Sequence, residues 1–271
     1  MPELPEVETT LRGIEPYIVN KKINDILVRQ SSLRWEVPIK DLKENIVGES
    51  FFKIKRRSKY LIFSNNFGNL IIHLGMSGSL KILLGMEAPN KHDHIDIKFE
   101  DKSLLRFTDP RRFGSFHWTN KSTKHPLLMN LGPEPLGNHF SGEHLFNFSR
   151  GRKVPVKNFI MNSKTIAGIG NIYASESLFE AGIKPHKAAG KISLPKYENL
   201  ANSIKRILQE SINLGGTSLK DFVGAEGKPG FYKPYLAVYG REGEKCKNCL
   251  TILKNIRIGQ RSSVFCSNCQ K

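Results

Sequence analysis

Apolar residues in the first part of the chain follow a two-residue period, after one helical stretch at the start. The spacing of Val7, Leu11 and Ile14 fits one helix face and predicts a helix over residues 5–15. Strict alternation of apolar and polar residues in 94–100 predicts a strand, which a turn connects to a return strand. Five more segments carry strand signals, namely 22–29, 51–55, 60–64, 70–73 and 79–84. Short strands separated by turn residues favour an antiparallel sandwich over alternating strand–helix units.

In the second half of the chain the pattern becomes helical. Apolar residues within 200–212 lie on one helix face, with Ser193 as a start signal and two glycines at 215–216 as a stop signal. A second apolar face within 174–181 predicts another helix. Residues 224–234 hold three glycines and two prolines and are expected to form a loop.

The net charge of the chain indicates which classes of binding partner are favoured. The chain has 271 residues, with 42 Lys and Arg against 25 Asp and Glu, so its formal net charge is +17 and its pI is near 9.7. This excess favours a polyanionic partner, although a basic protein without a specific ligand has the same composition. No apolar run approaches the roughly 20 residues of a membrane span, and no basic amphipathic helix favours a membrane surface. The N-terminus lacks the residue order of a secretion signal, so a cytoplasmic protein without a membrane partner is expected.

All four cysteines lie in the last 26 residues, in the pattern Cys246-x2-Cys249-x16-Cys266-x2-Cys269. Two knuckles of this spacing let four thiolates surround one Zn²⁺ tetrahedrally, which leaves no coordination position for water or substrate. We therefore expect one structural zinc that holds a small hairpin, with a redox-active pair as the competing interpretation. Residues 254–263 between the knuckles are basic and contain no acid, as expected of a hairpin that contacts phosphates.

The first eight residues, MPELPEVE, have two interpretations. An initiator methionine is normally removed before a small residue such as proline, which would leave Pro2 with a free secondary amine near Glu3 and Glu6. Such an amine can attack a sugar carbon and form an iminium ion, which is an electron sink that promotes elimination. An ordinary helix start, with proline in the first turn and acids near the positive helix end, explains the same residues equally well.

Three further motifs are also open to two interpretations. In GIGN, two glycines before Asn171 open a helix, which suits a phosphate-binding turn but also a tight turn between helices. Lys59 ends a basic strand edge, where most lysines are solvated, and it is a catalytic candidate only beside the N-terminal amine. Met76, Arg111 and Phe113 lie on Gly- and Pro-rich turns, which suits wedges that enter a base stack. In the alternative interpretation Met76 and Phe113 are core residues at strand ends.

Together these motifs resemble the formamidopyrimidine-DNA glycosylase family of base-excision repair enzymes. The resemblance runs along the whole chain, through PELPEVE, RRSKY, HLGMSGS, TDPRRFG, GIGNIYASE and the four-cysteine finger, in the family's order. It implies an α+β multidomain fold: an N-terminal antiparallel β-sandwich with flanking helices over 1–132, a helix-two-turn-helix domain over 133–236 and a four-cysteine zinc hairpin over 237–271. It also implies a bifunctional enzyme that excises oxidised purines, 8-oxoguanine and formamidopyrimidines, from duplex DNA and then cuts the strand by β,δ-elimination.

The resemblance implies roles for five catalytic residues. Pro2 attacks C1′ of the deoxyribose, Glu3 donates or accepts a proton at that sugar, and Glu6 supports it. Lys59 contacts the phosphate beside the lesion and donates the proton for β-elimination. Arg261, at the tip of the finger, holds the lesion phosphates and is associated with δ-elimination.

The same resemblance implies a set of DNA contacts. They are His73, Met76, His92, Arg111, Phe113, Arg152, Lys157 and Asn171. The three on the Gly- and Pro-rich turns fill the void left by the flipped base, and residues 217–232 match the loop that covers that base. Two residues depart from the family pattern: Ser58 replaces the glycine of RRGKY, and Asn158 replaces a frequent proline after Lys157.

Other classes of function remain open at this point. A pyrimidine-preferring relative of the endonuclease VIII type shares the amine and the finger, but it usually begins PEGPE and lacks the two wedge motifs. A non-catalytic zinc-ribbon DNA-binding protein, or an RNA-associated basic protein, would have the same charge without an amine nucleophile. The partner expected from the resemblance is double-stranded DNA with oxidised bases, bound by a monomer in the cytoplasm, at the nucleoid.

Overall fold

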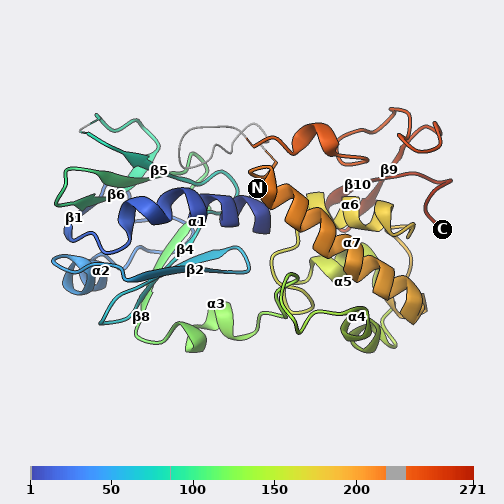
Figure 1. The fold of residues 1–271 in the computed structure, drawn as a ribbon, viewed down its shortest axis with the longest axis horizontal. Coiled ribbons are helices and arrows are strands. Elements are labelled where there is room, and N and C mark those ends of the chain that lie inside the picture. The colour runs from blue at the N-terminus through green and yellow to red at the C-terminus, as the bar shows by residue number, and fades with distance from the viewer. Residues whose placement is uncertain (1, 86, 218–229) are drawn as a thin grey trace. The chain divides into compact units, whose positions relative to one another are not determined.

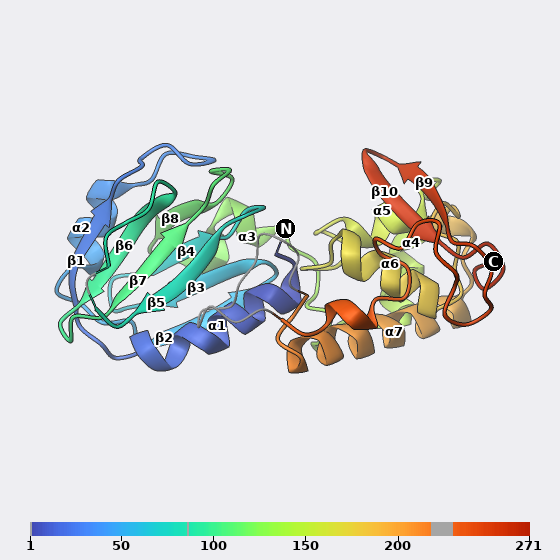
Figure 2. The ribbon, with the colours of Figure 1, turned by 90° about the horizontal axis from the view of Figure 1, so that it is seen from above.

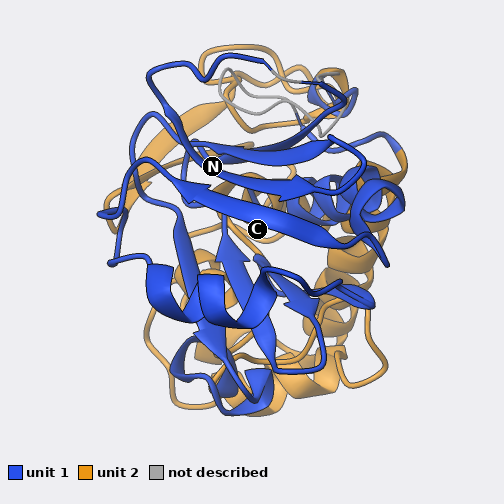
Figure 3. Ribbon diagram, turned by 90° about the vertical axis from the view of Figure 1, so that its left-hand side faces the viewer, with its two compact units in different colours: residues 1–129, 214–233 blue, residues 130–213, 234–271 orange. Residues whose placement is uncertain are grey.

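The computed structural model describes residues 2–85, 87–217 and 230–271 (Figure 1). The chain forms two compact units, which Figure 3 shows in different colours. The first unit consists of residues 1–129 and 214–233, and the second consists of residues 130–213 and 234–271. None of the helices within the described ranges has the length and apolar character that crossing a membrane requires.

In the described part of the first unit, eight strands form two antiparallel sheets of four strands each (Figure 2). The strand order of one sheet is β1 (Ile23–Val28), β6 (Asp93–Phe99), β7 (Leu104–Thr108) and β5 (Ser79–Leu83). The order of the other is β2 (Lys53–Arg57), β3 (Tyr60–Ser64), β4 (Asn69–His73) and β8 (Ser115–Thr119). These sheets confirm the expected β-sandwich.

The two sheets share one apolar core. Leu61 and Phe63 of β3 pair with Ile72 and Leu70 of β4, and all four side chains are buried in the same cluster as Ile97 of β6. Burial of each such side chain contributes roughly 1.5–3 kcal/mol, so the alternating pattern read from the sequence accounts for the pairing of the two layers.

Helix α1 (Leu4–Ile18) packs along β2 and β5, one edge strand of each sheet. Its buried face is the predicted one, but the helix runs past the predicted end at residue 15 and includes Pro16. The missing N–H of Pro16 falls in the last turn, where Val19 N–H closes the helix on Glu15 O at 3.1 Å. A short helix, α2 (Ile39–Ile46), contacts β1.

The described part of the second unit consists of helices and one β-hairpin. The elements are α4 (Gly142–Ser149), α5 (Val156–Met161), α6 (Asn171–Glu180), α7 (Leu194–Asn213), β9 (Lys254–Ile258) and β10 (Arg261–Phe265). Helix α7 packs against α4 and α6 through the predicted apolar face, and two glycines with positive φ, Gly215 and Gly216, follow its end. The hairpin packs on α6.

Four short helical segments connect these elements. They are η1 (Ser122–Lys124), α3 (Pro126–Met129), η2 (Ala189–Lys191) and η3 (Lys233–Tyr235).

Candidate active site, zinc centre and nucleic-acid interface

Pro2 directly precedes a reciprocal capping box at the start of α1. Glu3 is the N-cap residue: its carboxylate accepts the Glu6 N–H, and Glu6 Oε2 accepts the Glu3 N–H at 2.9 Å. Both glutamates are almost completely buried, with exposed fractions of 1% and 2%. The residue next to Pro2 is therefore fixed at its amide and at its side chain. The motif is a helix start, as one interpretation predicted, and it also places two buried carboxylates beside the candidate nucleophile.

The other oxygen of Glu6 binds a distant part of the first unit. Glu6 Oε1 accepts the N–H of Thr217 at 2.8 Å. Gly216 has a φ of +83° and lies so close that a Cβ there would be 3.1 Å from Glu6 Oε1, so a larger residue would disturb this contact. Glu6 thus connects the start of α1 to the beginning of the predicted base-covering segment 217–232, of which residues 218–229 lie outside the described residues.

Lys59 lies in the two-residue turn that connects β2 and β3, after Ser58. Ser58 has a φ of +57°, in the left-handed region that favours glycine, which explains the glycine of the family pattern. The Arg56 guanidinium donates to Ser58 O at 3.0 Å and to Glu8 Oε2 on α1 at 2.8 Å. The turn that carries Lys59 is therefore fixed to the helix that follows Pro2.

His73 at the end of β4 is positioned as a neutral hydrogen-bond donor. Its ring lies 4.8 Å from that of Tyr60, and its Nδ1 accepts the Gly75 N–H at 3.0 Å, so the neutral ring carries its proton on Nε2. Burial, with smaller contributions from the charges of Lys59 and Arg34, lowers the pKa of His73 to about 4. At neutral pH the ring can donate through Nε2 without carrying charge.

Met76, Arg111 and Phe113 lie on two turns of the first unit, after β4 and between β7 and β8. The exposed fractions of Met76 and Phe113 are 36% and 42%, and Arg111 is also exposed. The Arg111 guanidinium lies over the Phe113 ring, 5.0 Å from its centroid. The interpretation of Met76 and Phe113 as core residues is therefore wrong, because both side chains lie at the surface.

Two basic residues expected to touch DNA have accessible side chains. His92 is half-buried before β6, and its carbonyl oxygen accepts the Asp109 N–H at 3.0 Å. Arg152 is exposed after α4, where its Nε donates to Phe148 O at 2.6 Å. The structure places the two residues in different units, so each is a separate candidate contact.

Asn171 is the first residue of α6, after a turn in which Gly168 has a φ of +85°. Its side-chain oxygen is buried and has no hydrogen-bond partner among the described residues. This oxygen can only accept hydrogen bonds, so a phosphate at this position would be bound by the side-chain NH₂ group of Asn171 and not by the unpaired oxygen. Further along α6, the Glu176 carboxylate accepts the backbone N–H groups of residues 237–239 and so fixes the segment that leads into the finger.

Arg261 is exposed at the start of β10, next to the turn of the finger hairpin. Lys157 of α5 is only 1% exposed, and its Nζ donates to Ser262 O at 3.1 Å and to Ser263 Oγ at 2.8 Å. The ammonium group binds the two residues that follow Arg261 and supports the strand that carries it. The expected direct contact between Lys157 and DNA stays a prediction.

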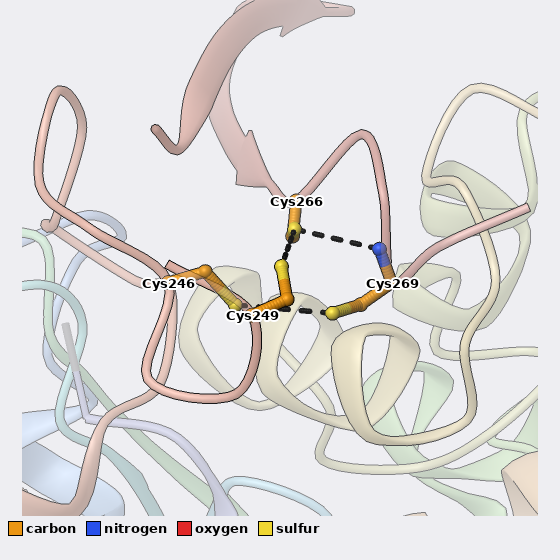
Figure 4. Close-up of side chains that lie close together, drawn as sticks. All are labelled: Cys246, Cys249, Cys266 and Cys269. Carbon is orange, nitrogen blue, oxygen red and sulfur yellow. Dashed lines mark hydrogen bonds between the residues drawn. The ribbon is translucent and has the colours of Figure 1, made fainter. Parts of the chain in front are cut away.

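The four cysteine sulfur atoms form a cluster with the geometry of a metal site (Figure 4). All four lie within 4.8 Å of one another, with 3.5 Å between Cys249 and Cys266 and 3.9 Å between Cys246 and Cys269. A tetrahedral zinc with Zn–S bonds of about 2.3 Å requires sulfur separations of about 3.8 Å, and the cluster fits this requirement. The thiols are free, and the Cys269 N–H donates to Cys266 Sγ at 3.4 Å. The group that fits is a single structural zinc, as predicted, with all four ligands supplied by the protein.

Three family models match successive parts of the chain: the formamidopyrimidine-DNA glycosylase N-terminal domain over 1–116, its H2TH domain over 131–223, and the zinc finger found in FPG and IleRS over 243–271. The chain belongs to the formamidopyrimidine-DNA glycosylase family. Curated formamidopyrimidine-DNA glycosylases of Stutzerimonas stutzeri and Stenotrophomonas maltophilia are 51% and 49% identical to it, with both chains covered completely.

Solved structures of the formamidopyrimidine-DNA glycosylase family have the same fold. A Lactococcus lactis FPG mutant in complex with DNA containing Fapy-dG is 34% identical, with a TM-score of 0.92. A MutM in complex with DNA containing carbocyclic 8-oxo-G is 35% identical, with a TM-score of 0.91. Each comparison covers 100% of both chains.

The buried acids of this formamidopyrimidine-DNA glycosylase family member that sequence reasoning did not assign include Asp109 and Glu176. Asp109 precedes a proline in a turn, where aspartate is common for local reasons, so the sequence gives no sign of its burial. Glu176 carries a clearer signal, because it lies four residues after Ile172 and three before Phe179 on one face of α6. An acid on an apolar helix face marks a buried group that requires partners.

Proposed function

We propose that the protein is a bifunctional DNA glycosylase and AP lyase of base-excision repair. Its proposed substrates are 8-oxoguanine and formamidopyrimidines in duplex DNA. The observation that supports this most directly is the pair of buried carboxylates, Glu3 and Glu6, beside Pro2 in a member of this family. A helix start at a surface does not require burial of two acids, and burial of a charged group is costly unless it is bonded.

In the proposed first step, the secondary amine of Pro2 attacks C1′ of the damaged nucleotide. A bond forms between the Pro2 nitrogen and C1′ while the bond from C1′ to the base breaks, and the base leaves with the electron pair and takes up a proton. The nitrogen gives up its proton, the C1′–O4′ bond opens, O4′ takes up a proton, and the freed nitrogen lone pair completes an iminium ion. We assign proton transfer at the sugar to Glu3, and positioning of Glu3 to Glu6, whose oxygens bind the Glu3 and Thr217 amides.

The iminium ion draws electrons from the sugar and makes the C2′ proton acidic. Loss of that proton forms a C2′–C3′ double bond and expels the 3′ phosphate, which is β-elimination. We assign the contact with the phosphate and the proton donation to Lys59. Neutral His73 at the end of β4 is assigned a hydrogen bond to DNA through its Nε2–H. We assign Arg261 to the phosphates of the lesion and to δ-elimination, which expels the 5′ phosphate.

The remaining candidates fit a role in opening the duplex. Flipping a nucleotide costs a few kcal/mol, and less when the base is damaged. We propose that Met76, Arg111 and Phe113, all exposed, fill the gap left by the flipped base. His92, Arg152 and Asn171 are proposed phosphate contacts. Lys157 is proposed to support Arg261 from the inside.

We propose that the protein acts as a monomer on nucleoid DNA in the cytoplasm, with residues 1–132 as the catalytic segment, 133–236 as the helical DNA-binding segment and 237–271 as the finger. The net charge of +17 is consistent with a polyanionic partner such as duplex DNA, and binding should weaken steeply as salt rises.

Borohydride trapping tests the proposal. Reduction during the reaction should convert the iminium ion into a stable amine and link Pro2 covalently to the DNA, and digestion with mass spectrometry should locate the link at Pro2. A duplex with 8-oxoguanine opposite cytosine should be trapped faster than one with thymine glycol. The reverse order would favour the pyrimidine-preferring alternative.

Pro2→Glu provides the matched control. A large second residue keeps Met1 in place, so the nitrogen of residue 2 remains in an amide and cannot form an iminium ion. This variant should bind lesion DNA but yield no adduct. If the wild type, with removal of Met1 established by intact mass, forms no adduct either, the non-catalytic DNA-binding alternative holds.

A further inference from the structure

A buried aspartate joins the turns that carry the exposed wedge residues Met76, Arg111 and Phe113. Asp109 lies between β7 and β8 and has an exposed fraction of 0%. Its Oδ1 accepts the Ser77 hydroxyl at 2.6 Å, and its Oδ2 accepts the Gly114 N–H at 2.7 Å. The first bond reaches the turn that carries Met76, and the second closes the turn that carries Arg111 and Phe113.

The backbone of Asp109 extends the same connection to the strand that follows His92. The Asp109 N–H donates to His92 O at 3.0 Å, and His94 Nε2 donates to Asp109 O at 2.8 Å. The Arg111 N–H lies 3.2 Å from Ser77 Oγ and 3.3 Å from Asp109 Oδ1. One residue therefore fixes the backbones beside three groups of candidate DNA contacts.

The two turns also contact each other directly. A Cβ added at Gly75 would lie 2.4 Å from the carbonyl carbon of Phe113. A Cβ added at Gly114 would lie 2.4 Å from the Phe107 ring and 3.2 Å from Asp109 Oδ2. Because neither glycine has room for a side chain, the turns form one packed body around Asp109.

We propose that Asp109 is a positioning residue that holds Met76, Arg111 and Phe113 together as one wedge for opening the duplex. The inference rests on the proposed glycosylase function. Side chains that enter a base stack must replace lost stacking, and turns that are already ordered lose less conformational entropy when they do so. Asp109 supplies that order from beneath the surface, without touching DNA itself.

The geometry requires two acceptor oxygens, so asparagine is a discriminating substitution. In Asp109→Asn, the remaining oxygen can accept the Gly114 N–H. The charge-assisted bond from the Ser77 hydroxyl is lost, and a weaker neutral bond from the new NH₂ group to Ser77 Oγ takes its place. The Arg111 N–H, 3.3 Å from Oδ1 in the wild type, then faces a donor. The substitution keeps the shape of the side chain and weakens the attachment of the Arg111 turn to the Met76 turn. Ser77→Ala removes the same connection from the other side.

Comparison of duplex and single-stranded substrates isolates the wedge. A single-stranded oligonucleotide with an abasic site has no stack to open and no opposite base, so borohydride trapping on it needs only the amine and the sugar. On a duplex with 8-oxoguanine opposite cytosine, Asp109→Asn and Ser77→Ala should each reduce the trapping rate about tenfold, the equivalent of ~1.4 kcal/mol. On the single strand both variants should match the wild type.

Asp101→Asn is the matched control, because Asp101 accepts the Ser103 N–H at the opposite end of the β6–β7 hairpin. Asp101→Asn should leave the trapping rates on both substrates unchanged. A second readout is 2-aminopurine placed opposite the lesion, whose fluorescence should rise on wild-type binding and rise less with Asp109→Asn.

Equal losses on both substrates for Asp109→Asn and Ser77→Ala, or no loss on the duplex, would overturn the role of Asp109. A wild type that traps neither substrate would overturn the proposed function itself, and this result is distinguishable from the other two. If Asp109→Asn does not fold, the outcome for Ser77→Ala decides.

Discussion

Lys157→Met tests whether a buried ammonium supports the finger from beneath. In the wild type Lys157 Nζ donates to Ser263 Oγ at 2.8 Å and to Ser262 O at 3.1 Å, and Lys157 is 1% exposed. Methionine has a similar length and fills nearly the same volume, so the substitution removes the charge and the donors while it creates little empty space.

The expected destabilisation follows from these contacts. Hydrogen bonds from a charged donor contribute about 1.5–3 kcal/mol each, and two are lost. Removal of a buried charge relieves part of its desolvation cost, which offsets some of that loss. We expect a net decrease of about 1–3 kcal/mol in the free energy of unfolding, small enough for the protein to remain folded.

The assay combines urea unfolding with analysis of the cleavage products of an abasic duplex. Lys157→Met should lower the unfolding free energy and also lower the ratio of β,δ- to β-elimination product, because the strand that carries Arg261 loses its support. Lys191→Met is the matched control, since Lys191 is exposed in the same unit and its loss changes the charge equally. A lower stability with an unchanged product ratio would refute the link between Lys157 and Arg261. An unchanged stability would show that the two buried bonds contribute nothing net.

Three other substitutions or treatments have defined outcomes. Ser58→Gly should raise the unfolding free energy by roughly 0.5–1 kcal/mol, because glycine adopts the +57° φ of this turn without strain. If urea unfolding gives a lower free energy for this variant, the buried serine side chain stabilises the turn by more than the backbone strain costs. His73 has a pKa lowered to about 4, so the unfolded chain binds its proton first and stability should fall as pH drops from 6.5 towards 4. His73→Gln should flatten part of that decline, and parallel curves for the two proteins would contradict the assignment. Removal of zinc by a chelator should disorder the finger and weaken DNA binding. The fluorescence emission of Trp35 and Trp118 should stay unchanged, because both residues lie in the first unit. A shift in that emission would show that the metal also stabilises the sandwich.

The sequence predicted the elements with strong local signals. The strand within 94–100 and the helix face in 200–212 were found because each repeats its period several times. The strands at 60–64 and 70–73 were found because each is a short apolar run next to turn residues. Strand β8 was missed, because Phe116 and Trp118 give only two apolar positions between a serine and a threonine. Short helices such as α5, with six residues, span too few turns to show a period.

The residues of the candidate site likewise differ in whether a local sequence pattern predicts them. The four cysteines could be predicted as metal ligands because their spacing is a local pattern, and the distances between their sulfur atoms agree with a metal site. The hydrogen bond between Glu6 and Thr217 joins residues 211 positions apart, so no local sequence pattern predicts it. The burial of Lys157 could not be predicted either, because its hydrogen-bond partners lie in a hairpin about a hundred residues later. Sequence could name these residues by resemblance, but only tertiary packing determines which ones reach solvent.

The interleaved path of the chain limits how this protein can be divided. The first unit is completed by residues 214–233, which return to it after α7 and before the finger. A fragment that ended at residue 129 would lack the Thr217 amide, and Glu6 Oε1 would lose its 2.8 Å donor beside the proposed nucleophile. Because neither unit is one uninterrupted stretch of the chain, a continuous fragment of the first unit lacks part of the support of the proposed nucleophile.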